Sequence, residues 1–555
     1  MSNPARNRSI DEFGVRALTL ALAVLITWIS LEQTGFVLGG NVFGIPYVMR
    51  FIDRPEFASD PYVTSLENFT SAVWPPLRWL APHIDPEALF RLAHTVTRSA
   101  SICALLLLGR PCGLGVWGAS LFTLMVAAGM AVIVDSRVGD HQMFVNVFVQ
   151  SVVTWPFVFL LLSALLANRL RLAAIALALI FDVNAFVAFW MLVVAAFQRG
   201  PALWRSPRKV QLQCVALFLL LVSPVAAWIV GSLAHTGVGT TFSYRQYVRE
   251  YFPQHFLVEA TSGRDLLRLA MYFLAAWFAA GPLRDARFWR LGLAGLLLLF
   301  VNGCWLPYVI DTRLIFNLHL LRSDGMLIAV SLIVQSLAFI RILGGASGLP
   351  YKFFAGLLAV ASFALPFSLL LGIGSTLFFL FEGSSVKAHM RDWLDQRWQN
   401  KPGNRAFVSI ALASVASVLV LFASHRTYAV APQPVELVDP SWVEIAGAIN
   451  REGPAGPYLV PLGEKTADTF ITQAQRPAWV SWKEGAAVMW FPAFYAQWSS
   501  RLKEVKKLQS AEQMLEYAKV KGIPEVVMAK PAGGCGERYK VRLETGRYVW
   551  CSAAP

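Results

Sequence analysis

Long apolar runs separated by short polar segments dominate the chain from its start to about residue 424. A helix needs about 17–25 apolar residues to cross about 30 Å of hydrocarbon, and these runs reach that length repeatedly. The pattern predicts a mainly α-helical, polytopic bundle of about 11–13 membrane helices. The clearest predicted spans are 15–34, 89–109, 115–135, 211–233, 264–281, 291–310, 325–343 and 406–424.

Two apolar stretches are interrupted. The stretch 172–198 is broken by Asp-Val-Asn at 182–184 and has basic residues at both ends. It predicts two half-length helices in a shallow hairpin on the cytoplasmic side, with Asp182 and Asn184 acting as helix breakers and caps. The run 353–381 contains Pro366 and the glycines at 372–374, and it predicts two short passes rather than one.

The pattern changes after residue 424. Short amphipathic segments alternate with strand-like ones, which predicts a small α/β domain over 425–555. Cys535 and Cys551 flank the alternating segment YKVRLETGRYVW, whose Thr-Gly turn is typical of a hairpin, so we expect a disulfide between them. The expected helices lie at 441–449 and 510–522, and the expected strands at 458–462, 525–529, 539–543 and 547–551.

Composition and charge support a membrane protein. The chain is 56% hydrophobic and only 15% charged, whereas a soluble protein carries about 25% charge. The net charge of +14 would suit nucleic acid, but Arg and Lys gather in short loops, which is the positive-inside pattern of cytoplasmic loops. We therefore expect no nucleic-acid partner. The N-terminus is predicted to be cytoplasmic, and the long loops 35–88 and 234–263 and the C-terminal domain periplasmic, in a bacterial inner membrane.

Polar chemistry collects in four loops on the predicted outer side. Acids suit deprotonation of a nucleophile, and arginines suit a phosphate or pyrophosphate group. We expect these loops to converge on one site for a lipid-linked phosphate, with the lipid lying between helices. In chain order they carry Asp53, Arg54, Glu56, Asp60 and Asp85; Asp135, Arg137, Asp140 and His141; Arg245, Arg249, Glu250, His255 and Glu259; and Asp311, Arg313, His319 and Arg322.

Several short motifs stand in these loops. They are FASDPYV, GDHQMF, FPQHF and LHLLR, and the tail adds TFITQAQRPAWVSWKEG and FYAQWSSRL. With the overall organisation, they resemble the GT-C superfamily of polyprenyl-phosphate-dependent glycosyltransferases, and most of all its uncharacterised bacterial members with a C-terminal outer domain. The resemblance maps the essential acid of the first loop onto Asp60. It maps the polar second loop onto Asp140 and His141, the Pro–His element onto His255, and the lipid-phosphate arginine onto Arg322.

The resemblance implies inverting transfer of a sugar from a polyprenyl-phosphate donor to a glycan or lipid acceptor of the cell envelope. Asp60 would be the general base, with Asp53 as the second candidate. Arg322, with Arg245 or Arg249, would hold the phosphate. His141 and His255 would orient the phosphate or a divalent cation, which is the one cofactor left open. The Asp-Glu pair of protein mannosyltransferases and the WWD-type motif of oligosaccharyltransferases are absent, so a protein acceptor is not implied.

Other interpretations stay open. Asp-Pro is a common turn opener, so Asp60 could serve a turn, and Asp53 could pair with Arg54. Arg476, Trp482 and Lys483 fit core packing and a solvated face better than a glycan site. The chain could also be a transporter or flippase of a lipid-linked or anionic substrate, although it shows neither midplane charges nor a repeat. A non-catalytic scaffold of a polysaccharide-export complex would keep the same fold.

Overall fold

The computed structural model describes residues 41–133, 136–145, 147–235, 242–345, 349–364, 369–382, 439–462, 467–530 and 534–553. The predicted helices 15–34 and 406–424, the predicted domain boundary after residue 424, and Asp135 lie outside the described residues. Among the described residues, five helical segments are long and apolar enough to cross a membrane. The chain is a mainly α-helical membrane protein with a small C-terminal sheet, as the sequence predicts.

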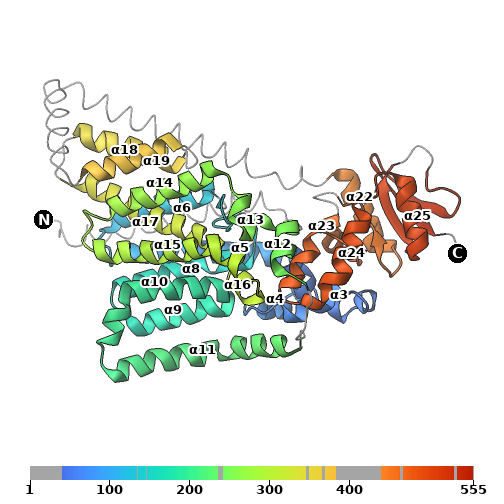
Figure 1. Ribbon diagram of the computed structural model, residues 1–555, viewed down its shortest axis with the longest axis horizontal. Coiled ribbons are helices and arrows are strands. Elements are labelled where there is room, and N and C mark those ends of the chain that lie inside the picture. The colour runs from blue at the N-terminus through green and yellow to red at the C-terminus, as the bar shows by residue number, and fades with distance from the viewer. Residues whose placement is uncertain are drawn as a thin grey trace, which may run out of the picture.

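The membrane helices run side by side, with one helix at their centre (Figure 1). This central helix is α17 (Asp324–Gly344), whose residues are almost all buried. It packs against α6 (Val116–Ile133), α14 (Gly263–Ala279), α15 (Ala286–Val309) and α18 (Leu349–Ala364). The bundle also contains α5 (Pro86–Gly109), α8 (Trp155–Leu166), α9 (Leu170–Val183), α10 (Ala185–Trp204) and α19 (Leu369–Glu382).

Helix α11 (Arg208–His235) lies at the edge of the bundle, beside α9 (Figure 1). Large apolar side chains such as Leu219 and Leu220 remain exposed on it, at 57% and 71%. In water such a face would be costly, but in a bilayer it meets lipid tails. Helix α11 is therefore a lipid-facing helix.

The interrupted stretches form two helices each, as predicted. Helices α9 and α10 break at Asn184, whose side chain accepts hydrogen bonds from the N–H groups of Phe186 and Val187. This hairpin is not shallow, because the carbonyls of Asp182 and Val183 at its apex accept bonds from Ala72 and Ser71 of the first loop, which is predicted to lie on the outer side. In the second stretch the two helices are α18 and α19, and the glycines at 372–374 lie inside α19.

The outer loops consist of short helices. The first loop holds α2 (Asn41–Val48), α3 (Pro61–Ser65) and α4 (Trp74–Leu80), with the 3₁₀ turns η1 (Phe51–Asp53), η2 (Pro55–Phe57) and η3 (Leu66–Asn68). A single turn, α7 (Gln150–Val153), precedes α8. The third loop holds α12 (Tyr244–Tyr251), α13 (Pro253–Phe256) and η4 (Val258–Ala260), and the fourth holds α16 (Arg313–Asn317) and η5 (Leu320–Ser323).

The C-terminal residues form a four-stranded sheet in the order β1-β2-β4-β3, with helices around it. Strand β1 (Tyr458–Leu459) pairs parallel to β2 (Glu525–Ala529), and β2 and β3 (Tyr539–Glu544) pair antiparallel to β4 (Tyr548–Ala553). Cys535 and Cys551 are disulfide-bonded. The helices are α22 (Pro440–Glu452), α23 (Ala467–Ala474), η6 (Lys483–Met489), η7 (Pro492–Phe494), α24 (Tyr495–Val505) and α25 (Ala511–Lys521).

The C-terminal part shares one hydrophobic core with the outer loops. Buried side chains of the first loop, the third loop and the tail form a single cluster, which includes Phe57, Tyr247 and Trp498. The Tyr247 hydroxyl donates to the Gly485 carbonyl at 2.7 Å. Trp498 is fully buried, and its ring centroid lies 4.5 Å from that of Tyr251. The tail is therefore packed onto the loops, at one end of the bundle (Figure 1).

Replacing Trp498 by alanine should loosen this packing. Removing a buried tryptophan costs about 3–5 kcal/mol, and the indole N–H also donates to the Ser481 carbonyl at 2.8 Å. We expect a lower midpoint of thermal unfolding in detergent and faster proteolysis of the tail. Trp79→Ala is the matched control, because Trp79 is 72% exposed. Equal midpoints for the two variants would contradict a shared core.

Candidate functional site

A cavity of about 440 Å³ lies where the bundle, the outer loops and the C-terminal part meet. Its polar wall comes from five separate segments of the chain, and its apolar wall from the first loop, the α9–α10 hairpin and α11. The polar side chains include Asp140, Asn184, His255, His319, Arg322 and Lys483, and the apolar ones include Phe43, Phe69, Phe181, Phe186, Ile229 and Leu233.

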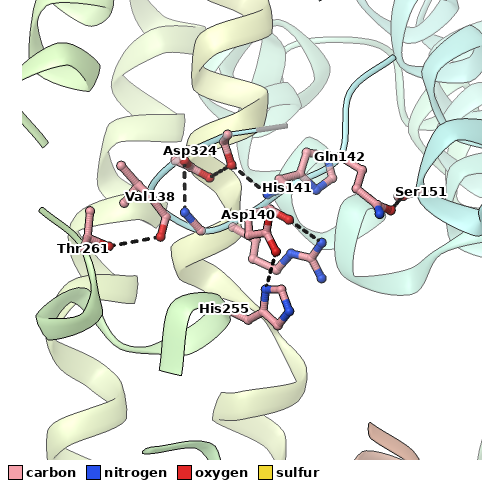
Figure 2. A network of polar contacts seen from close by, with 11 residues as sticks. Val138, Asp140, His141, Gln142, Ser151, His255, Thr261 and Asp324 are labelled. Carbon is pink, nitrogen blue, oxygen red and sulfur yellow. Dashed lines mark hydrogen bonds and ion pairs between the residues drawn. The ribbon is translucent and has the colours of Figure 1, made fainter. Parts of the chain in front are cut away.

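Asp324 fixes the second outer loop against the start of α17 (Figure 2). Its carboxyl is fully buried and accepts hydrogen bonds from the Ser136 hydroxyl at 2.9 Å and the Gly139 N–H at 3.2 Å. The Ser136 hydroxyl oxygen in turn accepts from the His141 N–H at 2.7 Å. A buried carboxyl needs such partners, so these bonds hold residues 136–141 in one position.

The loop approaches the fourth outer loop closely enough to exclude side chains. A Cβ at Gly139 would lie 2.6 Å from the Cα of Arg322. A Cβ at Gly325 would lie 2.5 Å from the His141 ring. Glycine is needed at both positions because another backbone or ring occupies the space.

Arg322 and Asp140 are joined through the backbone. The Arg322 guanidinium donates to the Asp140 carbonyl at 2.8 Å (Figure 2). Asp140 has a φ of 55°, a left-handed conformation that is uncommon outside glycine. Its carboxylate lies 3.3 Å from Nδ1 of His255, and its side chain is 41% exposed. Asp140 therefore presents a carboxylate to the cavity.

His255 is a neutral imidazole at pH 7. Burial lowers its pKa to about 3, and the positive charges of Arg322 and Lys483 act in the same direction. The 3.3 Å contact between Nδ1 and the Asp140 carboxylate is not a hydrogen bond, because Nδ1 has no hydrogen-bond partner among the described residues. A neutral imidazole has one N–H donor and one acceptor nitrogen, and such a low pKa makes His255 a poor base.

His319 lines the cavity from the fourth loop. It is held in a left-handed conformation, with a φ of 46°. Its ring lies between those of Phe186 and Phe256, at centroid distances of 4.9 and 4.7 Å. The preceding carbonyl, of Leu318, accepts a bond from the indole N–H of Trp190 at 3.0 Å. The α9–α10 hairpin therefore contacts the fourth loop and supports it through this hydrogen bond.

Lys483 is the contribution of the C-terminal part. Its backbone N–H donates to the Asp468 carboxylate at 2.9 Å, which fixes the start of η6. Burial lowers the pKa of Lys483, while Asp468 and Asp140 oppose that shift and Arg322 adds to it. A bound anion would favour the charged form of this lysine. With Arg322 and Arg313 on the same wall, cations outnumber the single carboxylate of Asp140.

The structure brings Asp140, His255 and Arg322 together, as the sequence predicts, and places His141 directly behind them. His141 is 2% exposed and lies against Trp155 and Trp190, at centroid distances of 6.0 and 5.4 Å. Burial lowers its pKa to about 3, with Arg322 acting in the same direction. It lines a smaller adjoining cavity of about 200 Å³.

Three other candidates lie outside the cavity. Asp53 forms exposed ion pairs with Arg50 and Arg78, at 2.8 and 3.0 Å. Arg245 donates from Nε to the Pro307 carbonyl at 2.9 Å. Arg249 pairs with Glu259 at 2.9 Å, and both side chains are about half exposed. All three hold the outer loops in place.

Asp60 also lies elsewhere. Its carboxylate accepts from the N–H groups of Tyr62 and Val63, at 2.9 and 3.1 Å, and so caps α3. It lines a second cavity, of about 310 Å³, between the first loop and the C-terminal part. Glu484 and Arg501 line the same cavity. The prediction of Asp60 as a turn residue is therefore met, and its role as general base stays a prediction.

Three residues of the first cavity or its support are not favoured as site residues by the sequence, whereas His319 belongs to the polar loops expected to converge. Asp324 stands in the motif region LHLLRSDG, but no local pattern shows which loop its carboxyl contacts. Asn184 was interpreted only as a helix cap, although it also lines the cavity. Lys483 was assigned to a solvated face. The sequence feature that could have marked Lys483 as a site residue is the density of aromatic and charged residues around it.

Among the described residues, no three His, Cys, Asp or Glu side chains are placed to hold a metal ion. Asp140, with His255 beside it, offers two ligand atoms, fewer than a closed metal site uses. The divalent cation that the sequence left open stays a hypothesis.

Comparison with known proteins gives one kind of similarity. No protein-family model matches the sequence, and no curated protein matches it. The structure is similar to that of the arabinofuranosyltransferase AftD from mycobacteria, with a TM-score of 0.45 and 15% identity over 93% of this chain. A structure of a variant of AftD gives a TM-score of 0.43 and 14% identity over 93% of this chain.

This chain covers 35% and 36% of those two AftD chains, so it spans about a third of their length. A likeness at this level identifies neither an activity nor a substrate.

The carboxyl pair of the second cavity should make stability depend on pH. Burial raises the pKa of Asp60 to about 6, against the hydrogen bonds from the Val63 and Tyr62 N–H groups. Burial and the nearby Asp60 raise the pKa of Glu484 well above its ordinary value, and Arg501 opposes both shifts. The folded state thus holds protons that the unfolded state releases near pH 4. Stability should fall as the pH rises from about 4 to above 6.

The measurement is the unfolding midpoint in detergent at about pH 5 and about pH 8. We expect the midpoint to drop less for Glu484→Gln than for the unaltered protein, because the substitution removes one of the two coupled carboxyls. Parallel pH profiles for the two proteins would show that these carboxyls do not titrate with folding.

Proposed function

We propose that the protein is a membrane glycosyltransferase that uses a polyprenyl-phosphate-linked sugar as donor. The observation that carries the proposal is the composition of the first cavity. Its lining holds cations and histidines together with apolar side chains, some of which belong to α11, a helix whose outer face suits lipid. A phosphate attached to a long hydrocarbon chain combines the same two kinds of chemistry.

The phosphate would bind near Arg322 and Lys483. Arginine offers several N–H donors in a planar arrangement that matches phosphate oxygens, and lysine adds a compact charge. His255 reports a positive local field, because both cations lower its pKa in addition to burial. A neutral imidazole can donate a hydrogen bond to a phosphate oxygen without adding charge. The polyprenyl chain would lie along Phe181, Ile229 and Leu233.

Asp140 is the carboxylate best placed to act as general base. In the proposed step its oxygen takes the proton of the acceptor hydroxyl, and the acceptor oxygen attacks the anomeric carbon. The bond from that carbon to the phosphate oxygen breaks, and the lipid phosphate leaves with the electron pair, held by Arg322. Attack opposite to the leaving group inverts the anomeric configuration. Asp60 faces the other cavity, so we assign the base to Asp140 in its place.

The acceptor is proposed to be a cell-envelope glycan or lipid on the periplasmic face of a bacterial inner membrane. The basic short loops at the opposite end of the bundle support this orientation. A transporter would need its polar groups near the middle of the membrane, whereas this cavity lies at the level of the outer loops. The position of the cavity therefore favours transfer over transport.

The donor site can be tested by binding. In full-length protein in nanodiscs, Arg322→Ala should weaken binding of polyprenyl phosphate about tenfold to hundredfold, because a charged hydrogen bond contributes about 1.5–3 kcal/mol. Native mass spectrometry or a radiolabelled lipid measures the affinity. Arg249→Ala is the matched control, since that arginine pairs with Glu259 outside the cavity. Equal affinities for the two variants would remove the phosphate from this cavity.

The same nanodiscs separate transfer from its rivals. With a polyprenyl-phosphate sugar and membrane-glycan extract, Asp140→Asn should lower transfer by about two orders of magnitude or more while donor binding persists. Asp60→Asn should have a smaller effect. The opposite order would restore Asp60 as the base. Movement of the lipid-linked sugar between leaflets without transfer would identify a flippase, and binding without either reaction would identify a scaffold.

A further inference from the structure

The second cavity has a lining that the donor site does not use. It lies between the first outer loop and the C-terminal part, with a volume of about 310 Å³. Two of its side chains, Asp60 and Glu484, are buried carboxyls, 8% and 6% exposed. They come from positions more than four hundred residues apart in the sequence, so folding has brought two groups that repel each other to one place.

Glu484 has an unused polar atom there. Its Oε2 accepts from the Ser481 N–H at 3.1 Å, while its Oε1 is buried and has no hydrogen-bond partner among the described residues. A buried oxygen without a partner costs about 1–3 kcal/mol. A structural role for Glu484 would be served by its Oε2 alone, so the second oxygen points to a ligand that enters the cavity.

The remaining lining suits a polyhydroxylated molecule. The Arg501 guanidinium carbon lies over the Trp479 ring, 3.8 Å from its centroid, and the guanidinium donates to the Trp479 carbonyl at 3.1 Å. The stacking holds the arginine rigidly beside an aromatic surface. Carboxyl oxygens accept bonds from hydroxyls, guanidinium N–H groups donate to them, and an indole packs against C–H groups.

The two cavities share a wall. Lys483 lines the first cavity, and Glu484 lines the second. The two residues are adjacent at the start of η6, which is anchored from both directions by the shared core. A molecule that occupies the second cavity therefore lies behind the segment that supplies a cation to the donor site.

We propose that the cavity between Asp60, Glu484, Arg501 and Trp479 is a binding site for a neutral glycan. A phosphorylated ligand is disfavoured because the lining holds three carboxyls, those of Glu56, Asp60 and Glu484, and one arginine. That the glycan is the acceptor of the transfer reaction rests on the proposed function, whereas binding itself does not. The hydroxyls of one sugar ring donate hydrogen bonds to Glu484 and Asp60, and the Trp479 ring packs against one face of the glycan.

The test measures glycan binding by full-length protein in nanodiscs. The probes are soluble hexasaccharides of four kinds, namely α-glucan, β-glucan, mannan and arabinan, titrated by calorimetry. We expect saturable binding of at least one probe. Glu484→Leu should weaken it about tenfold or more, because the polar partners of the hydroxyls are lost. Lys483→Leu, the same change one residue earlier, should leave it within about twofold.

A second variant guards against misfolding. Asp60→Asn keeps the oxygen that caps α3, so it should preserve the fold and still weaken glycan binding severalfold. Lipid binding gives the reciprocal readout, because Lys483→Leu should weaken polyprenyl phosphate binding and Glu484→Leu should not. The proposal is overturned if no probe binds or if both leucine variants bind glycan equally well. It is also overturned if calcium chloride titrated without glycan produces the same calorimetric signal.

The two proposals fail separately. Glycan binding that depends on Glu484, in a protein that transfers no sugar, would leave this site standing and remove the proposed reaction. Transfer that is unchanged in Glu484→Leu at limiting acceptor would remove the acceptor role of this site and leave the reaction standing.

Discussion

The outer half of the molecule depends on one aromatic core that no single segment could form. The first and third outer loops are made of helices of only one or two turns, and such helices are not stable alone. They become ordered because Phe57, Tyr247 and Tyr251 bury their rings against Trp498 and its neighbours from the tail. The hydrogen bond from Tyr247 to the Gly485 carbonyl fixes the register of this contact. Each cavity lies at an edge of this core.

The polar groups of the first cavity are positioned by backbone contacts more than by side-chain pairs. Asp324 holds the backbone of the second loop, and Arg322 binds the carbonyl of Asp140 rather than its carboxylate. The carboxylate is therefore not neutralised by the nearest cation. This arrangement keeps an acid and an excess of positive charge in one space, which a direct ion pair would have cancelled.

Much of the fold could be predicted because a helix that crosses a bilayer needs an apolar run of matching length, and such runs are visible in the sequence. The spans within the described residues, the interruption at Asn184, the strands of the tail and the Cys535–Cys551 pair follow from local pattern. The depth of the α9–α10 hairpin could not be read in the same way. It depends on hydrogen bonds from Ser71 and Ala72, which lie more than a hundred residues away.

The site was predictable only in part, and for the same reason. Asp140, His255 and Arg322 stood in recognisable polar motifs of loops on one side of the membrane. Asp60 stood in the most suggestive motif, but the α3 helix beginning at Pro61 uses its carboxylate as a cap. Lys483 could not be assigned, because the shared core, which forms only on folding, brings residue 483 to the first cavity. Sequence pattern locates polar residues along the chain, and long-range packing decides which of them meet.

The neighbouring positions of Lys483 and Glu484 have a thermodynamic consequence. One peptide bond joins Lys483, which lines the first cavity, to Glu484, which lines the second. A ligand that shifts this backbone in one cavity therefore alters the other cavity. Linkage then requires that each ligand change the affinity of its counterpart by the same factor. The occupancies of the two sites would then be coupled, and one binding polynomial for both ligands would describe them in place of two independent equilibria.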